Sequence, residues 1–429
     1  MSSSKAKDRL LSKDYILIMF SATAYALMNH FFLATAPLYV SKLGGSAFQA
    51  GMLATVYSMT ALAARPISGA LSDKSGRVKM LVAGALICAA TCAVIGFVSS
   101  IPLLLVIRAV AGVGFGMLST CAGAAAADVL PKSRLAEGIG YFSLYSTAAQ
   151  AIGPGIALMI IAGDRISDYR TLYIMTAGLC AASAASSCCI TYERKRKRHA
   201  SGEPGASAGA DMPADSAAPE PGSAPGGAGL LPKTLLGFEY AVFAPAAVLM
   251  LAQIGLSGIS VFMSQFARWK DFGNPGLYFT VTAVGTLLSR LFFGKVADRR
   301  GSDIIIIPAL AVLTACIALI PAARSMSVLV AMAFPVGIAQ GAVLPTINSM
   351  LFKRCSPARR GTASGAYFAA LDLGFAIGAP LLGAVAGAFD YNFIYWASAA
   401  STAVAMLLYM MISTDRRHNM KAGVLPQGH

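Results

Sequence analysis

The sequence predicts an all-α integral membrane protein with twelve transmembrane helices in two pseudo-symmetric halves of six. Its 429 residues are 56% hydrophobic and only 12% charged, with a mean hydropathy of +0.66. That is too little polar surface to cover a soluble globule of this size. The chain also contains twelve apolar runs of the length, about 20 residues, that a helix needs to cross a bilayer. A charged motif recurs in the second half of the chain, which indicates two related halves.

The apolar runs follow one another with polar segments between them. No run alternates apolar and polar residues with a period of two, and Gly and Ala are abundant, which favours closely packed helices over strands. The predicted spans cover residues 15–40, 47–71, 79–99, 102–129, 135–163, 169–191, 237–268, 273–297, 303–323, 326–351, 359–388 and 391–413.

The repeated motif lies between the second and third spans of each half. It reads Gly69-Ala-Leu-Ser-Asp73-Lys-Ser-Gly76-Arg77 in the first half and Gly294-Lys-Val-Ala-Asp298-Arg299-Arg300-Gly301 in the second. An arginine precedes each copy, at 65 and at 290, and matching positions differ by 225 residues throughout. A glycine such as Gly76 allows the positive φ of a tight reversal, and Asp73 is able to accept hydrogen bonds from free N–H groups at a helix start. The motif therefore predicts a tight, charged turn between two helices.

The distribution of basic residues predicts the orientation in the membrane. Of the 34 Lys and Arg, 25 fall in the terminal segments, the central segment and every second loop, whereas the other loops carry only six. This asymmetry places both termini in the cytoplasm of a multi-pass protein of the cytoplasmic (inner) membrane. Basic loops beside anionic lipid also account for the net charge of +15 without a nucleic-acid partner.

The two halves are expected at 1–191 and 234–429, with a linker at 192–233. The linker begins with a basic run and continues in Ala, Gly, Pro and Ser with almost no large apolar residue, which predicts a disordered cytoplasmic tether. The first apolar run follows a basic start without a cleavage site, which favours a retained anchor over a signal peptide.

The composition also argues against catalysis and against bound cofactors. The eight cysteines form no C-x-x-C pair and lie mostly among Ala and Ile, so they are interpreted as small packing residues and no metal or other cofactor is expected. No nucleophile, base and orienting group fall in plausible register, and no phosphate loop is present. We therefore do not expect an enzyme.

Three motifs together resemble the major facilitator superfamily. They are the loop at 69–77, Arg108-x-x-x-Gly112-x-Gly114 in the fourth span, and Gly153-Pro154 in the fifth. Within the superfamily, Pro37-Leu-Tyr39 in the first span and Arg65-Pro66 before the loop look most like bacterial efflux permeases of the arabinose-efflux and drug–proton antiporter type. The resemblance implies that Asp73 binds near Arg359 or Arg360, at the start of the span 359–388, and that Arg77 pairs with Asp128, so that the loop locks the two halves.

In the second half the position matching Asp128 is Arg354, so a weaker lock is expected there. The residues assigned to this loop lock are Gly69, Asp73, Gly76, Arg77 and Asp128 in the first half and Gly294, Asp298, Arg299 and Gly301 in the second.

Three ionisable residues within the spans are the candidates for coupling. Asp372 lies near the middle of 359–388, where an acid costs roughly 2.5 to 3.5 kcal/mol on insertion scales, and the first half has Ser146 at the matching position. It is interpreted as a proton or cation site; the alternative is a capping or inter-helix hydrogen bond. His30 is a second candidate, the alternative being a histidine satisfied by a hydroxyl. Arg108 is predicted to be a cavity cation that competes with protons or holds an anionic substrate, or else a charge tied to backbone carbonyls.

The predicted function is proton-coupled export of a small organic molecule, such as a drug, sugar or metabolite, by alternating access around a cavity at mid-depth. Uptake by proton symport is the first alternative, and a non-transporting membrane receptor or sensor is the second. The expected partners are the substrate, protons and membrane lipid, with a monomer as the default because one chain holds a complete pathway. The residues predicted to line the cavity, with His30, are Asn29, Tyr145, Gln150, Gln253, Gln340 and Tyr367.

Overall fold

The computed structural model of the chain describes residues 11–193, 234–235, 238–354 and 360–421, and the predicted linker falls almost entirely outside these ranges. The first group of elements comprises α1 (Lys13–Lys42), α2 (Ala47–Ser75), α3 (Arg77–Ile95), α4 (Ile101–Val129), η1 (Lys132–Arg134), α5 (Leu135–Phe142), α6 (Leu144–Ile160) and α7 (Ile166–Cys188). The second group comprises a short antiparallel pair, β1 (Thr234–Leu235) and β2 (Phe238–Glu239), followed by α9 (Tyr240–Trp269), α10 (Gly276–Arg300), α11 (Asp303–Leu319), η2 (Ile320–Ala322), α12 (Met326–Arg354), α13 (Arg360–Ala388) and α14 (Tyr391–Lys421).

The predicted all-helical membrane architecture is confirmed. Within the described residues, ten helices are long and apolar enough to cross a membrane by length and composition. The two remaining span positions are occupied by α10 and by the consecutive helices α5 and α6.

The predicted span 135–163 is not one continuous helix. It is divided at Ser143, between α5 and α6, whereas Pro154 lies inside α6 without ending it. Gly138 and Gly140 lower the helix propensity just before the break. The Ser143 hydroxyl also donates a hydrogen bond of 2.7 Å to the carbonyl of Gly140, and such bonds compete with regular helical pairing. The break is therefore encoded locally, by glycine and serine rather than by proline.

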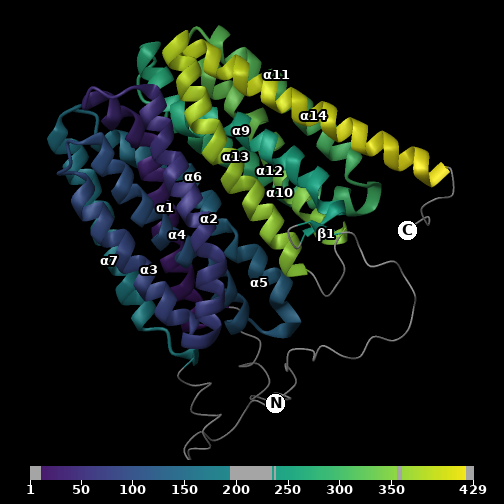
Figure 1. Cartoon of the computed structure of the whole chain (residues 1–429), viewed down its shortest axis with the longest axis horizontal. Helices are drawn as coiled ribbons and strands as arrows, with labels where there is room; N and C mark the ends of the chain where they lie inside the picture. Colours follow the sequence, from purple (N-terminus) through teal and green to yellow (C-terminus); the bar gives the residue numbers. More distant parts are fainter. Residues whose placement is uncertain (1–10, 194–233, 236–237, 355–359, 422–429) are drawn as a thin grey trace, which may run out of the picture.

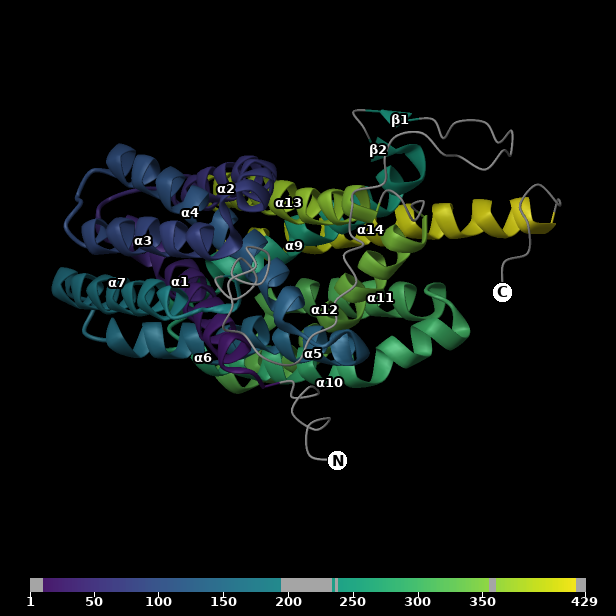
Figure 2. The same ribbon diagram turned by 90° about the horizontal axis from the view of Figure 1, so that it is seen from below.

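The helices form two bundles that meet at one end. Figure 1 shows α1–α7, purple to teal, and α9–α14, green to yellow, side by side at one end and separating toward the other. We call the end where α1 and α9 finish the converging end, and the end where α1 begins and α14 finishes the diverging end. The view from below shows α2 beside α13 and α6 beside α10 (Figure 2), and these pairs are in extensive contact.

The two seams between the bundles, α2–α13 and α6–α10, are related by the sequence repeat. Thr55 donates a hydrogen bond of 2.7 Å to the carbonyl of Ala376, and Thr280 donates one of 2.6 Å to the carbonyl of Ala151. Both donors and both acceptors differ by the same 225 residues that relate the two loop motifs. The duplication seen in the sequence is therefore also present in the contacts that join the halves.

Each bundle has its own apolar core. One cluster in the second bundle surrounds Phe262, Phe266 and Tyr278. The first bundle has two clusters, one including Tyr25 and one including Tyr173. Four of the cysteines, at 88, 92, 121 and 180, are buried in the first bundle among these apolar side chains. This placement agrees with a packing role.

We expect the substitution Gly337→Ala, at the contact between α10 and α12, to destabilise the protein strongly. A Cβ at Gly337 would lie 2.0 Å from the carbonyl oxygen and 2.8 Å from the carbonyl carbon of Thr282. Backbone atoms cannot rotate away, so overpacking should lower the free energy of unfolding by about 3 kcal/mol. Thermal unfolding of the purified protein measures this loss. Gly387→Ala is the control, because its Cβ would meet no atom within 4 Å. An equal loss in both variants would show that contact at Gly337 is not the cause.

Candidate functional site

An ion pair joins the two bundles in the middle of the α2–α13 seam. Arg65 Nε lies 2.9 Å from Asp372 Oδ2, and a second guanidinium nitrogen donates at 3.5 Å to Oδ1. The remaining nitrogen donates to Ser119 Oγ at 3.1 Å, and the guanidinium lies 4.7 Å from the ring centre of Phe368. Both charged side chains are about 15% exposed, at 14% and 15%. The pair is thus well shielded, and the hydrogen bond to Ser119 holds Arg65 in place.

The sequence identified the depth of Asp372 but not its partner. Arg65 lies 18 residues into α2 and Asp372 lies 12 residues into α13, which puts both about 18 to 27 Å along their helices. A carboxylate at this depth requires a nearby cation or water, and Arg65 supplies the cation. The available signal was that Arg65, like Arg108 and Arg290, lies well inside a predicted span, whereas the other arginines lie in loops or within two residues of a span end.

Arg108 is packed between aromatic rings. Its guanidinium carbon lies 3.5 Å from the ring centre of Phe32 and 3.8 Å from that of Tyr57. The residue is 2% exposed, and its Nε has no hydrogen-bond partner. Cation–π attraction stabilises a desolvated guanidinium in such a position. In this state Arg108 is therefore held by rings of α1 and α2, an arrangement that neither sequence-based alternative described.

A small cavity lies between the bundles near mid-depth, and we call it the small polar cavity because five of its eleven lining residues are polar; the other six are apolar. His30 of α1, Gln150 of α6 and Gln340 of α12 line it, so the structure brings together three of the predicted residues. Ser260 of α9 and Thr282 of α10 add hydroxyl groups. The cavity volume is about 20 Å³, which is about enough for one water molecule. Both bundles thus contribute hydrogen-bonding side chains to one cavity.

The other predicted lining residues lie outside this cavity. The Tyr145 hydroxyl is hydrogen-bonded to that of Tyr25 at 2.6 Å, and Tyr367 packs edge-on against the ring of Phe368. Gln253 is half-buried on α9 beside Gly374 of α13, and Asn29 is half-buried next to His30 on α1. The role predicted for these four residues in substrate binding therefore stays a prediction.

The loop motif of the first half forms the tight turn that the sequence predicts. Gly76 has a φ of +103°, and Arg77 pairs with Asp128, the contact that the family resemblance implied. Arg77 also donates at 2.7 Å to the carbonyl of Ala124. Glu193 was missed: its Oε1 accepts hydrogen bonds from the free backbone N–H groups of Arg77, at 2.5 Å, and Val78, at 3.3 Å. Only the fold reveals this cap, because the residues are more than 100 positions apart.

Other positions assigned to the loop lock are not engaged in this state. Asp73 is exposed and pairs with no described residue, and a Cβ at Gly69 would meet no atom within 4 Å. Arg359 and the side chain of Arg360, the implied partners of Asp73, lie outside the described part of the chain. In the second half Gly301 has a φ of +87° just after α10. The backbone of Gly294, Asp298 and Arg299 belongs to α10, and their side chains are outside the description.

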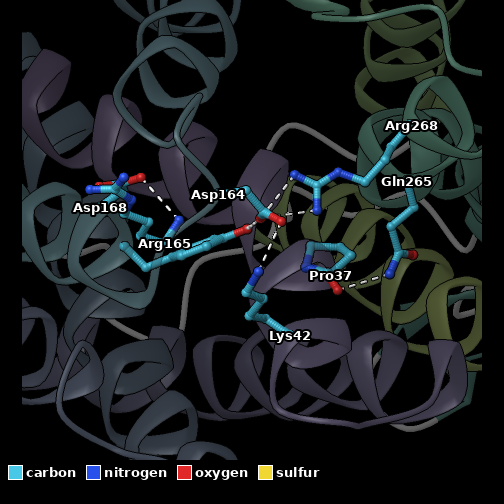
Figure 3. Close-up of polar contacts among 8 residues, drawn as sticks. Pro37, Lys42, Asp164, Arg165, Asp168, Gln265 and Arg268 are labelled. Atoms are coloured by element: carbon cyan, nitrogen blue, oxygen red, sulfur yellow. Dashed lines mark hydrogen bonds and ion pairs between the residues drawn. The ribbon is translucent and has the colours of Figure 1, made fainter.

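At the converging end, one acid bridges the two bundles (Figure 3). Asp164, after α6, lies 2.9 Å from Lys42 Nζ at the end of α1 and 3.1 Å from two guanidinium nitrogens of Arg268 on α9. Next to it, Gln265 of α9 donates a hydrogen bond of 2.8 Å to the carbonyl of Pro37 on α1. We call Lys42, Asp164 and Arg268 the latch.

We expect Asp164→Asn to loosen the converging end, because it removes the negative charge that holds Lys42 and Arg268. Partial burial raises the pKa of Asp164, but hydrogen bonds and charge from Lys42 and Arg268 outweigh it and hold the pKa below its ordinary value of 3.8. The lowered pKa means that the carboxylate stabilises the latch above pH 3.8 and loses this effect only as the pH falls through the lowered value. At neutral pH, Asp164→Asn should therefore increase the labelling rate of a cysteine placed at Pro37, several-fold. Arg165→Gln, on a neighbouring exposed residue, is the control. Unchanged labelling would show that the latch does not hold this end closed.

Two helical bundles related by a repeat, with a shielded ion pair and a small polar cavity between them, define a membrane transporter. Comparison with known proteins gives the family. Residues 18–267 and 245–425 match the Major Facilitator Superfamily, so the chain belongs to this superfamily, as the motifs had indicated. The staphylopine export protein of Staphylococcus aureus is 23% identical over 92% of this chain and 94% of its own length. The multidrug resistance protein MdtG of Escherichia fergusonii is 26% identical over 92% of each chain.

Solved structures agree on the fold. The nucleoside transporter NupG, in a D323A mutant, superposes with a TM-score of 0.69 at 14% identity, covering 93% of this chain and 99% of that one. A bacterial homologue of the lysosomal transporter Spinster, in an inward-facing and occupied conformation, gives 0.69 at 15% identity over 93% and 96%. At such identities the likeness concerns the fold alone.

Within the described residues no group of three or more His, Cys, Asp or Glu is placed to hold a metal ion.

Proposed function

We propose that this chain is a proton-coupled exporter of a small organic molecule that works by alternating access in the cytoplasmic membrane. The observation that carries the proposal is the Arg65–Asp372 pair, because it places a titratable acid at mid-depth and makes its partner a residue of the other bundle. The names of the relatives, a staphylopine export protein and multidrug efflux proteins, support export over uptake.

The pair couples protonation to movement as follows. When Asp372 is ionised, its attraction to Arg65 holds α13 against α2. A proton on Asp372 removes that attraction and leaves only a neutral hydrogen-bonding group, so the energy of separating the two bundles falls. Substrate and proton then compete through one conformational equilibrium, which needs no direct contact between them.

The arrangement of contacts supports a state that is closed to the outside. Among the described residues, the hydrogen bonds between the bundles lie at the converging end or in the middle of the helices. The basic residues cluster in segments at the diverging end, which assigns that end to the cytoplasm. Substrate would therefore enter from the cytoplasm, and reversal would require the latch to open and the loop lock to engage Asp73.

The direction of coupling is tested with proteoliposomes and a panel of labelled drugs, sugars and metabolites. Exchange of substrate for protons predicts that an acidic lumen drives accumulation of at least one compound. Accumulation only with an acidic exterior would replace export by symport. Movement that ignores the pH gradient, or specific binding without any movement, would refute proton-coupled transport. The result does not depend on which way the protein is inserted in the vesicle membrane, because the pH gradient alone sets the direction of net substrate movement.

A further inference from the structure

Three arginines, Arg65, Arg108 and Arg290, lie well away from the ends of their membrane spans, and among the described residues Arg290 alone of the three has neither an ion-pair partner nor a cation–π contact. Arg65 pairs with Asp372, and Arg108 lies between two rings. Arg290 of α10 makes a single hydrogen bond, from one terminal nitrogen to the carbonyl of Ser143, and it is long at 3.4 Å. Its Nε is buried and has no partner. No carboxylate of the described chain forms an ion pair with it.

The depth of Arg290 makes this arrangement costly. It lies 14 residues into α10, about 21 Å from the converging end of the helix, and a guanidinium offers five N–H donors in a planar fork. One long hydrogen bond satisfies little of that capacity. An arginine kept at such a depth without a carboxylate partner among the described residues points to water or an anionic ligand.

The sequence repeat explains why the partner is missing. Arg290 corresponds to Arg65, and Asp372 corresponds to Ser146 in the first half. The Ser146 hydroxyl donates a hydrogen bond of 3.2 Å to the same carbonyl, that of Ser143, that Arg290 uses. The helix break at Ser143 thus supplies a backbone acceptor where the other seam has a carboxylate. The α6–α10 seam keeps the cation of the pair but not the anion.

Arg290 lies on the same side of α10 as a residue that lines the small polar cavity. Phe279, which lines the cavity, precedes it by eleven residues on α10, which is close to three full turns and so the same side of the helix. The titratable side chains near enough to interact electrostatically with Arg290 are Tyr145 of α6 and Tyr367 of α13. Both were predicted from the sequence to contact substrate. Arg290 therefore lies between the cavity and the diverging end, among groups from both bundles.

We propose that Arg290 binds the carboxylate of the transported molecule, which makes the substrate an organic acid or zwitterion. This inference rests on the proposed function, since it assumes that the space between the bundles carries substrate. The guanidinium fork matches a carboxylate in two parallel hydrogen bonds. Thr282, at the cavity, lies eight residues from Arg290, so a molecule that reaches both spans about 12 Å. The uncharged end of this substrate contacts His30, Gln150 and Gln340, whose side chains form hydrogen bonds with uncharged groups.

The test measures equilibrium binding in detergent, so that it does not depend on coupling. The probes are aryl alkanoates, N-acylated dipeptides and sugar acids, each beside its carboxamide, and ligand-induced thermal stabilisation gives the affinity. Wild type should bind at least one carboxylate about ten-fold or more tightly than its amide, because a charge-assisted pair is lost in the amide. Arg290→Gln should abolish this preference, and Arg290→Lys should restore part of it. Arg324→Gln, an exposed arginine of the converging end, is the matched control.

Two results would overturn the assignment. One is a wild type that binds no carboxylate of the panel better than its amide. The other is an Arg290→Gln protein that folds and keeps the preference. Carboxylate-selective binding by a wild type that moves no substrate with protons would instead leave Arg290 assigned and refute the proposed function alone.

Discussion

Asp372→Asn should abolish proton-driven accumulation of substrate while leaving exchange of labelled for unlabelled substrate intact. Asparagine has the same size and still accepts a hydrogen bond from Arg65, but it cannot take up or release a proton in the working pH range. If one proton moves per substrate, a gradient of two pH units supports about 100-fold accumulation in the wild type. The variant should equilibrate without accumulation. Both quantities are measured in the same proteoliposomes, with and without a pH gradient.

The matched control for this substitution is Asp271→Asn. Asp271 is exposed at the converging end, and its backbone has a φ of +57°, which asparagine tolerates well. The Asp271→Asn variant should accumulate substrate as the wild type does. Accumulation that survives in Asp372→Asn would limit Asp372 to helix packing, and the coupling role would move to His30.

Arg65→Gln should destabilise the protein strongly, and adding Asp372→Asn should restore most of the loss. Removal of the cation leaves a carboxylate that is only 15% exposed without its partner. Breaking one side of a buried ion pair in this way costs about 3 kcal/mol or more, most of it from the uncompensated charge. The double variant has two neutral amides that can hydrogen-bond to each other. Thermal unfolding of the wild type, both single variants and the double variant gives the interaction energy.

A second readout separates stability from coupling in this cycle. The double variant should be nearly as stable as the wild type and yet show no proton-driven accumulation. If the double variant recovered both stability and proton-driven accumulation, the Arg65–Asp372 pair would have a structural role only. If the two single losses simply added, Arg65 and Asp372 would not act on each other at all.

Most of the fold was predictable because the bilayer imposes simple rules on the sequence. Long apolar runs, basic loops and a motif repeated at a fixed offset are local or periodic signals, and they predicted the helices and the two halves. The break at Ser143 was missed because the apolar run 135–163 continues through it. In a membrane helix a proline is tolerated where neighbouring groups satisfy the freed carbonyl, whereas glycine and serine near a helix start ended the helix.

The site was less predictable because its residues come from different helices, and the sequence does not state which residues of two facing helices lie opposite each other. The depth of Asp372 followed from its position in a span, but the choice of Arg65 as partner depended on how α2 and α13 cross. Glu193 and Asp164 lie near helix ends, where many polar residues are simply solvated, so nothing distinguished them beforehand. Of the seven residues predicted to line a cavity, His30, Gln150 and Gln340 line the one between the bundles and the other four do not, because depth in a span does not state which side of the helix a residue occupies.

The most direct measurement of the central claim is a distance between the bundles as a function of pH. Spin labels at Ala162→Cys and Ala322→Cys, both exposed at the converging end on opposite bundles, report its opening in a cysteine-free background. Asp164 keeps its charge over this range because its pKa is lowered, so the latch itself should not titrate between about pH 5.5 and 8. The proposal predicts a pH-dependent distance distribution in the wild type and a fixed, protonated-like distribution at every pH in Asp372→Asn. The same pH response in both proteins would contradict it.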